Sequence, residues 1–296
     1  MKVLLIYNPN AGFKRAKKIL PDVERLFVEK GIDYDLCLTE YQGHGREIVQ
    51  SADFKQYDGL IAAGGDGTLF EVTNGYFKNS SRKKISIGIV PVGTGNAFFR
   101  EFNIDSSNWK DAVDIISSGK TRKVDVALFR SHGEYFYFMN IMGLGFVADV
   151  TKSASYLKIF GNIAYTLGVL YRTVFLKSFR LHIEIDGKEL ERENIFVEVS
   201  NTRYTSNFLM APNAKVDDGM LDITLLGKIS RRRLLKSFPK IFTGEHIYLE
   251  EVETYKAKRI KIETDPPKII TPDGELVGIT PVEIETIQKG IDLFWP

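Results

Sequence analysis

The chain has 296 residues, of which 44% are hydrophobic and 26% are charged. This composition is typical of folded globular proteins and excludes the disordered, collagen-like and disulfide-rich classes. Forty basic and 38 acidic residues leave a net charge of +2, which excludes a protein that binds nucleic acid over its whole surface.

One cysteine, Cys37, and four histidines are too few for a zinc site built from Cys and His. A lone cysteine also fits a reducing compartment. The N-terminal apolar run, residues 3–7, is too short for a signal peptide. No run reaches the roughly 18 uncharged apolar residues of a membrane span. We therefore expect a cytoplasmic protein.

The first 105 residues alternate short apolar runs with helical patterns. Strands are predicted over residues 3–7, 34–38, 59–63 and 85–90, and helices over residues 14–30 and near 45–52. A repeated strand–turn–helix order indicates a parallel sheet with helices on its faces. We expect an α/β domain over residues 1–122, with residues 288–296 as a candidate segment that completes it.

After Lys120 the pattern changes to strands joined by tight turns. Strands are predicted over residues 124–130, 135–141, 180–185, 194–200, 221–226 and 259–263, and longer helical patterns near residues 155–176 and 230–242. Alternating strands with hairpin turns such as Asp186-Gly187 favour an antiparallel, β-sandwich-like domain. This second domain is expected over residues 123–287.

Three glycine-bearing loops follow strands of the predicted parallel sheet, where ligands of such sheets bind. They are Asn8-Pro9-Asn10-Ala11-Gly12, Gly64-Gly65-Asp66-Gly67-Thr68 and Pro91-Val92-Gly93-Thr94-Gly95-Asn96. Glycine lets the backbone approach a phosphate, and the start of the next helix presents unpaired N–H groups to it. The Asp66 carboxylate would repel a phosphate, so we expect a cation or a hydroxyl beside it, from Mg²⁺ or a ribose.

These motifs resemble the catalytic domain of the diacylglycerol kinase and sphingosine kinase superfamily. The resemblance includes Glu71 and Asn74-Gly75 after the second loop, and it continues along nearly the whole chain in order. Its later parts are Gly143-Leu144-Gly145-Phe146, residues 211–222, and Asp273-Gly274-Glu275 followed by Pro281-Val282.

The resemblance implies that ATP phosphorylates a lipid hydroxyl, with Mg²⁺ as the metal, in a cleft between the domains. It also assigns nucleotide-binding positions. These are Asn8, Pro9, Asn10, Ala11, Gly12, Thr39, Gly64, Gly65, Asp66, Gly67, Thr68, Leu69, Phe70 and Thr94.

In the second domain, the resemblance places Asp218 on the metal ligand, with main-chain oxygens of Lys215 and Met220 beside it. Either Glu275 or Asp273 falls on the base that takes the hydroxyl proton. Ala97 stands where the family often has Asp, and the sphingosine and ceramide kinase branch also has Ala there. The acceptor therefore stays open among diacylglycerol, phosphatidylglycerol, a sphingoid base and a polyprenol.

Two segments bear on the lipid. Residues 223–244 hold six basic and no acidic residues, with apolar residues at helical spacing. This pattern is typical of a helix that lies on an anionic membrane, and equally of a packed helix with solvated charges. A helix over residues 156–175, with Phe160, Leu167, Leu170 and Tyr171, is typical of a core helix and could alternatively line an acyl-chain cleft. We expect transient, peripheral membrane contact, no nucleic-acid partner, and a homodimer as a candidate assembly.

Two other functions compete with a lipid kinase. An NAD kinase shares the Gly64–Thr68 type of loop and a two-domain plan but phosphorylates a soluble ribose. A non-catalytic nucleotide- or lipid-binding module would bind ATP and transfer no phosphate. The Asp273-Gly274-Glu275 turn and the basic segment favour a lipid acceptor over NAD. Together with Asp218, the three loops argue against a silent module.

Overall fold

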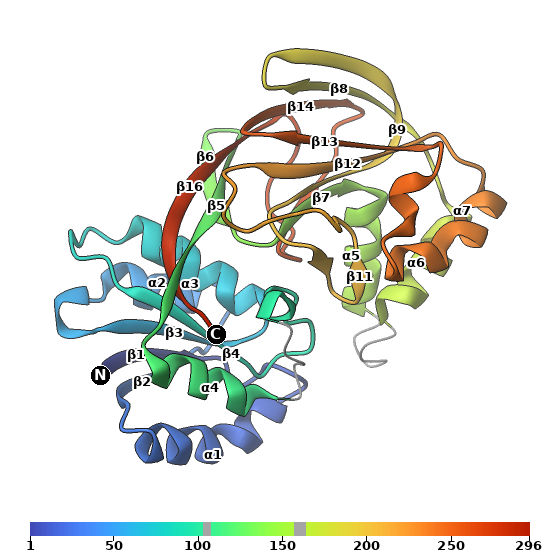
Figure 1. The fold of residues 1–296 in the computed structure, drawn as a ribbon. Coiled ribbons are helices and arrows are strands. Elements are labelled where there is room, and N and C mark those ends of the chain that lie inside the picture. Colours follow the sequence, from blue (N-terminus) through green and yellow to red (C-terminus); the bar gives the residue numbers. More distant parts are fainter. Residues whose placement is uncertain (103–107, 157–163) are drawn as a thin grey trace. The chain divides into compact units, whose positions relative to one another are not determined.

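The structure is a computed structural model that describes residues 1–102, 108–156 and 164–296. It divides into two compact units (Figure 1). Unit 1 comprises residues 1–124 and 289–296, and unit 2 comprises residues 125–288. The chain passes between them along β5 (Thr121–Ser131) and β16 (Val282–Phe294).

Unit 1 is built on a parallel sheet. Its strands are β1 (Lys2–Tyr7), β2 (Asp33–Leu38), β3 (Gly59–Gly64) and β4 (Ser86–Pro91). They lie in the order β4-β3-β1-β2, and the end of β16 joins β4 in parallel through Leu293 and Ile87. All six residues of β3 are buried, as expected for a parallel strand covered on both faces.

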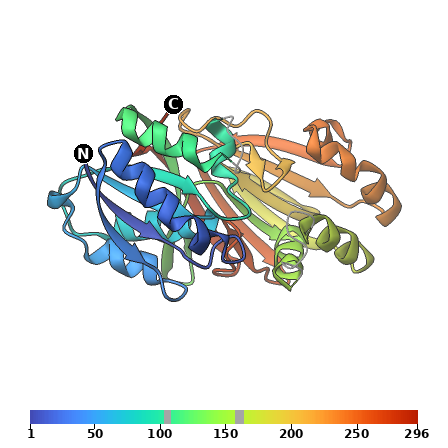
Figure 2. The ribbon, with the colours of Figure 1, turned by 90° about the horizontal axis from the view of Figure 1, so that it is seen from below.

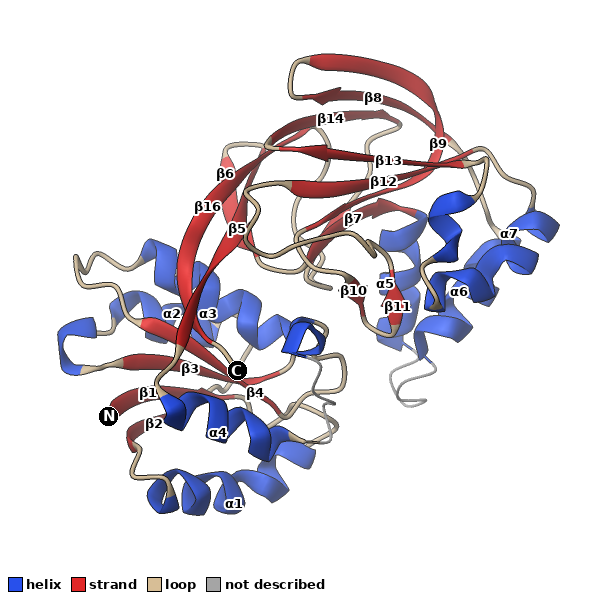
Figure 3. Ribbon diagram, viewed as in Figure 1, coloured by secondary structure: helices blue, strands red, loops and turns tan. Residues whose placement is uncertain are grey.

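Helices cover both faces of this sheet. They are α1 (Arg15–Glu29), α2 (His44–Ser51), α3 (Asp66–Lys78) and α4 (Trp109–Ser118), with short 3-10 turns η1 (Phe54–Gln56) and η2 (Phe98–Phe102). α1 and α4 lie on one face, and α2 and α3 lie on the other (Figures 2 and 3). α1 buries Ala16, Val23 and Phe27, a spacing that places all three on one side of a helix.

Unit 2 is an antiparallel, β-sandwich-like structure. Its strands are β5, β6 (Glu134–Phe138), β7 (Ile141–Gly145), β8 (Phe179–Ile185), β9 (Lys188–Ser200), β10 (Tyr204–Thr205), β11 (Phe208–Leu209), β12 (Leu221–Gly227), β13 (Val252–Ala257), β14 (Arg259–Asp265), β15 (Ile270–Pro272) and β16. The main order is β13-β12-β9-β8-β14-β16. The first half of β9 pairs with β8, and its second half pairs with β7. This one strand therefore connects β8 and β7 within the sheet. The predicted fold class is confirmed for both units.

Helices and 3-10 turns accompany the strands in the described part of unit 2. They are α5 (Phe146–Tyr156), α6 (Ala164–Val174), α7 (Arg231–Ser237), η4 (Phe238–Phe242) and η5 (Glu245–Tyr248). The helix predicted near residues 230–242 is divided at Ser237. Pro239 has no N–H and its ring crowds the preceding turn, so the α-helix gives way to a 3-10 turn there.

The helix predicted over residues 156–175 is represented by α6, and Phe160 lies outside the described residues. Leu170 and Tyr171 are exposed, so the expectation of a plain core helix is wrong for these two positions. None of the helices in the described ranges combines the length and the apolar character needed to cross a bilayer.

Candidate functional site

Three predicted loops meet at one edge of the unit 1 sheet. β1, β3 and β4 are neighbours and run in the same direction, so their carboxyl ends lie together. We call the segments that leave them loop 1 (residues 8–12), loop 2 (residues 64–68) and loop 3 (residues 91–96).

Hydrogen bonds hold the three loops against one another. The Asn8 side chain in loop 1 donates from Nδ2 to Thr68 Oγ1 in loop 2 at 3.3 Å. The main-chain N–H groups of Val92 and Gly93 in loop 3 donate to the Gly64 oxygen in loop 2 at 3.1 and 2.9 Å. Loop 2 is therefore the central segment of the cluster.

Glycine makes the close approach of these loops possible. A Cβ atom added to Gly93 would lie 2.4 Å from the Gly65 Cα atom, far inside van der Waals contact. Gly12 has a φ of +58°, and a Cβ atom there would lie 2.8 Å from the Val92 oxygen. The meeting point of the loops is thus lined by main chain, which suits a ligand recognised through N–H groups.

The Asp66 carboxylate connects loop 2 to the segment after loop 3. Its Oδ1 atom accepts a hydrogen bond from the Ala97 N–H at 2.8 Å. The sequence-based expectation of a cation or hydroxyl partner missed this contact, because the partner is a main-chain group that any residue at position 97 except proline would supply. Asp66 therefore holds the loop cluster together in addition to any role toward a ligand.

The start of α3 is suited to an anion. Gly65 is its N-cap, and no side chain caps the helix. The Thr68 and Leu69 N–H groups both donate to the Gly65 oxygen, at 3.0 and 3.1 Å. The positive end of the helix dipole at this terminus attracts an anion such as phosphate. In loop 3, Thr94 and Gly95 are exposed. Thr94 supplies a side-chain hydroxyl, and Gly95 has no side chain to cover its main chain.

The remaining predicted nucleotide-binding residues differ in exposure. Thr39 is 7% exposed, and its N–H donates to the Tyr7 oxygen at 2.8 Å. Leu69 and Phe70 are buried inside unit 1, so their side chains pack in the core of this unit. Asn10 is exposed and the other residues are half-buried, namely Pro9, Ala11 and Gly67.

Two side chains near the loops have roles that their residue types alone do not reveal. Arg15, which belongs to none of the predicted motifs, donates from its guanidinium to the Gly93 oxygen at 3.3 Å and brings a positive charge to the loop cluster. Glu71 accepts the N–H groups of Gly43 and Gly45 at 2.6 and 2.9 Å. It therefore caps the start of α2 and serves the fold.

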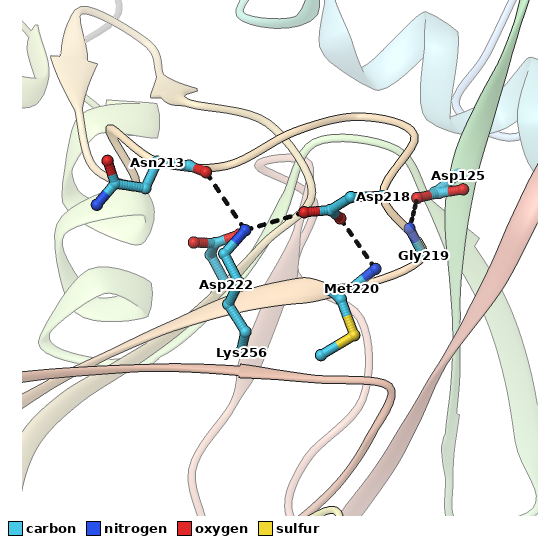
Figure 4. Close-up of polar contacts among 7 residues, drawn as sticks. All are labelled: Asp125, Asn213, Asp218, Gly219, Met220, Asp222 and Lys256. Atoms are coloured by element: carbon cyan, nitrogen blue, oxygen red, sulfur yellow. Dashed lines mark hydrogen bonds and ion pairs between the residues drawn. The ribbon is translucent and has the colours of Figure 1, made fainter.

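In unit 2, Asp218 belongs to a cluster of oxygen atoms around the Lys256 ammonium (Figure 4). Lys256 Nζ lies 3.0 Å from Asp218 Oδ2, 3.0 Å from Asp222 Oδ2 and 3.3 Å from the Asn213 main-chain oxygen. Asp218 Oδ1 accepts the Met220 N–H at 3.0 Å. Lys256 and Asp222 were not selected from the sequence, because strands β12 and β13 bring them to this point.

Burial and ion pairing both shift the pKa values of Lys256 and Asp222. Burial by itself lowers the pKa of Lys256, but its bonds to Asp218 and Asp222 outweigh this and hold the pKa above its usual value. Burial also raises the pKa of Asp222, against the opposing effect of Lys256. A cavity of about 170 Å³ lies beside these side chains, lined by Asn213, Thr224 and other residues of β12 and β13.

The residues around Asp218 fit an oxygen-preferring cation. The three atoms that hold the Lys256 ammonium are all oxygens, and two belong to carboxylates. In the described part of the chain, no three His, Cys, Asp or Glu side chains group together as a complete metal site. Mg²⁺ commonly binds through one or two carboxylates and completes its shell with water and phosphate. The exposed Lys215 and half-buried Met220 would contribute main-chain oxygens.

Asp273 is 5% exposed and is bonded to the turn between β6 and β7. Its Oδ1 atom accepts the N–H groups of Asn140 and Ile141 at 3.0 and 3.1 Å, and its Oδ2 atom accepts the Met139 N–H at 3.1 Å. Its own N–H donates to the Ile141 oxygen, and its φ is +47°. Both carboxylate oxygens of Asp273 are therefore engaged in holding main chain.

Glu275 follows two residues later and has a different environment. It is half-buried, and its N–H donates to the Pro272 oxygen at 2.8 Å, which closes the turn that begins at Asp273. The hydrogen bonds of the Asp273 carboxylate to residues 139–141 hold this turn in place, and Glu275 lies at its end. The two carboxylates that the sequence left equivalent thus differ in burial, and Asp273 accepts three main-chain N–H groups.

A buried chain of polar contacts links the Asp218 turn to the Asp273 turn within unit 2. Gly219 N–H donates to Asp125 Oδ2 at 2.6 Å, and Asn201 Nδ2 donates to the main-chain oxygens of Asp125 and Met139 at 2.9 and 2.8 Å. Met139 N–H in turn binds Asp273. Asp125 and Asn201 are fully buried. Their only signal in the sequence is a polar residue within or directly after an apolar strand.

Two family models match the chain. The diacylglycerol kinase catalytic domain matches residues 2–129. The YegS C-terminal NAD kinase beta sandwich-like domain matches residues 140–294. The first contains all three loops of unit 1, and the second contains Asp218, Asp273 and Glu275.

Curated relatives and solved structures agree with these matches. The chain is 31% identical to a diacylglycerol kinase of Bacillus subtilis, over 99% of this chain and 95% of that protein. It is 32% identical to a diacylglycerol kinase of Staphylococcus aureus, over 99% of this chain and 91% of that protein. A crystal structure of a diacylglycerol kinase from Bacillus anthracis superposes with a TM-score of 0.71 at 28% identity, covering 100% of this chain and 97% of that one.

Proposed function

This chain belongs to the diacylglycerol kinase family and is a lipid kinase, and from that premise we propose its reaction in detail. It transfers the γ-phosphate of ATP, with Mg²⁺, to a hydroxyl group of a diacylglycerol-like lipid at a membrane surface. The observation that carries this proposal is the meeting of loops 1, 2 and 3 at the uncapped start of α3.

Unit 1 binds the polyphosphate of ATP in this proposal. Phosphoryl transfer depends mainly on positioning the phosphates and compensating their charge. In this proposal the dipole at the start of α3 and the exposed Thr94 and Gly95 of loop 3 face the phosphates. Arg15, held against the Gly93 oxygen at 3.3 Å, supplies positive charge beside them.

Unit 2 supplies the groups that act on the acceptor. We assign the general base to Glu275, because Asp273 is occupied with three main-chain N–H bonds and Glu275 is held on the turn that Asp273 fixes. Glu275 takes the proton of the lipid hydroxyl as the hydroxyl oxygen bonds to the γ-phosphorus of ATP. The bond between the γ-phosphorus and the bridging oxygen of the β-phosphate breaks in the same step, and ADP leaves. Mg²⁺, held by Asp218 and the main-chain oxygens of Lys215 and Met220, would neutralise phosphate charge when bound.

The function is tested with labelled ATP, purified protein and separate lipid classes dispersed in non-ionic detergent. We expect label in a product of diacylglycerol or a closely related lipid, and none in NAD. Label in NAD alone would replace the proposal with an NAD kinase. ATP binding without label in any lipid would replace it with a binding module.

Lys256→Met is expected to tighten Mg²⁺ binding to the protein without ATP, on the order of tenfold. The Lys256 ammonium now holds Asp218 Oδ2 at 3.0 Å, and a divalent cation must compete with it for that carboxylate. The side chains are partly exposed, so solvent screening keeps the effect well below the unscreened Coulomb value. Isothermal titration calorimetry with MgCl₂ measures the affinity directly.

Lys261→Met is the matched control. Lys261 is another lysine of unit 2, and its ion pair is with Glu184, at 3.4 Å, rather than with Asp218. It should bind Mg²⁺ as the wild type does. Weaker Mg²⁺ binding by Lys256→Met would mean that the ammonium organises the site rather than competing for it.

A further inference from the structure

α6 presents an unusual stripe of exposed apolar side chains, which we call the apolar stripe. It consists of Leu170, Tyr171, Val174 and Phe175, whose exposed fractions range from 47% to 62%. Leu170, Tyr171 and Val174 lie on one side of α6 by their spacing of i, i+1 and i+4. Phe175 directly follows the helix. The Tyr171 and Phe175 rings contact each other edge to face, with centroids 5.4 Å apart. Contiguous exposed apolar surface of this kind marks an interaction site.

Positive charge lies directly beside the apolar stripe. The Arg231 guanidinium, in the first turn of α7, donates to the Val174 oxygen at 3.1 Å, and α6 and α7 are in contact (Figures 1 and 2). We call Arg231, Arg232 and Lys236 the basic cluster. All three are exposed, and none has an ion-pair partner within the described ranges 1–102, 108–156 and 164–296. Arg233 differs, because it pairs with Glu251.

The sequence around both elements contains no opposing charge. Residues 167–181 hold three basic and no acidic residues, and residues 228–243 hold six basic and no acidic residues. The helix that carries the basic cluster is packed against the core of unit 2. Leu234, Phe238 and Ile241 pack against the buried cluster that contains Phe196 and Phe208, so α7 and η4 are anchored while Leu235 remains 43% exposed.

We propose that the apolar stripe and the basic cluster together form a docking surface for an anionic lipid bilayer; the inference rests on the proposed lipid kinase function. Exposed aromatic and aliphatic side chains insert at the boundary between headgroups and acyl chains, and Lys and Arg bind anionic headgroups. A second copy of this chain is a poorer occupant, because it would bring the same uncompensated positive charges together.

Vesicle co-flotation without ATP tests this surface. The wild type should bind vesicles of phosphatidylcholine mixed with phosphatidylglycerol and bind pure phosphatidylcholine much more weakly. Replacing the basic cluster by glutamine (Arg231→Gln, Arg232→Gln, Lys236→Gln) should weaken binding to the anionic vesicles about 100-fold, at about fivefold per cation. Tyr171→Ser with Phe175→Ser should weaken binding while leaving its salt dependence in place.

The matched control removes three cations elsewhere in unit 2, by Lys188→Gln, Lys258→Gln and Lys261→Gln. It should keep wild-type vesicle binding. Wild-type-like binding by the basic-cluster variant, or equal binding of the wild type to both vesicle compositions, would overturn the proposal. A third result would also overturn it. If the wild type is a dimer in light scattering, and Tyr171→Ser with Phe175→Ser makes it a monomer that still binds vesicles normally, then the apolar stripe contacts a second copy of the chain.

Failure of the docking surface and failure of the proposed function give different results. Phosphorylation of diacylglycerol in detergent micelles does not require docking to a charged bilayer. Normal micellar activity with no vesicle binding would reject the docking surface alone. Vesicle binding with no lipid phosphorylation in micelles would reject the proposed reaction alone.

Discussion

Asp66→Ala is expected to lower kcat/KM by more than about 100-fold, the loss that a small displacement of reacting groups produces. The Asp66 carboxylate accepts the Ala97 N–H at 2.8 Å, and it lies in the first turn of α3, where the proposed phosphate site is. Its removal releases the segment after loop 3 and takes a charged group from the site. Initial rates with labelled ATP and titration with a fluorescent ATP analogue measure both effects.

Asp66→Asn separates the two contributions, because an amide oxygen still accepts the Ala97 N–H while the charge is lost. If Asp66 acts only by joining loops 2 and 3, Asp66→Asn should recover most of the activity. If the charge itself is used, Asp66→Asn should stay as inactive as Asp66→Ala. Both proteins should melt within a few degrees of the wild type. Near-normal turnover of Asp66→Ala would remove this residue from the site.

Glu275→Gln is expected to lower kcat by about 10²- to 10⁴-fold, the usual contribution of a general base. Its affinity for ATP should stay within about twofold of the wild type, because a base acts on the acceptor hydroxyl in the transition state. Steady-state kinetics with diacylglycerol in micelles and a separate ATP titration provide the two numbers. An unchanged kcat would transfer the role of base to Asp273.

Asp273→Asn is the paired control and should act on stability. An amide nitrogen must replace one of the two oxygens that accept main-chain N–H groups, so at least one buried hydrogen bond to a charged acceptor is lost. Such bonds contribute about 1.5–3 kcal/mol each. The melting temperature should fall, and the activity per folded molecule should fall far less than for Glu275→Gln. A stable Asp273→Asn protein with no activity would contradict the assignment of Asp273 as a structural residue.

Local sequence patterns were sufficient to predict the helices and strands whose formation depends mainly on their own residues. The fully buried run of β3 and the one-sided apolar spacing of α1 are visible in the sequence, and both elements formed within one or two residues of their predicted bounds. Parallel neighbours end at one edge of a sheet, so the meeting of loops 1, 2 and 3 could also be anticipated. The lipid kinase prediction depended on motif order along the chain.

Side-chain roles were less predictable, because they depend on partners distant in the sequence. Asp273 and Glu275 are two residues apart and chemically alike, yet Asp273 is 5% exposed and accepts three N–H groups of residues 139–141, while Glu275 is half-buried. Lys256 reaches Asp218 because β12 and β13 are antiparallel neighbours that place Asp222 opposite Lys256. The exposure of Leu170 and Tyr171 was likewise hidden, since an apolar stripe on a helix has the same spacing whether it is covered or open.

The order of strands and helices, the glycine-bearing loops and the acidic turns were determined by the sequence alone, because hydrophobic period, chain stiffness and turn preference act over a few neighbouring residues. Tertiary structure decided which carboxylate is held by main chain, which lysine neutralises Asp218, and which apolar side chains remain open to solvent. Each of these depends on a contact across tens to more than a hundred residues of chain. Burial and charge at such a contact exist only after the strands have paired.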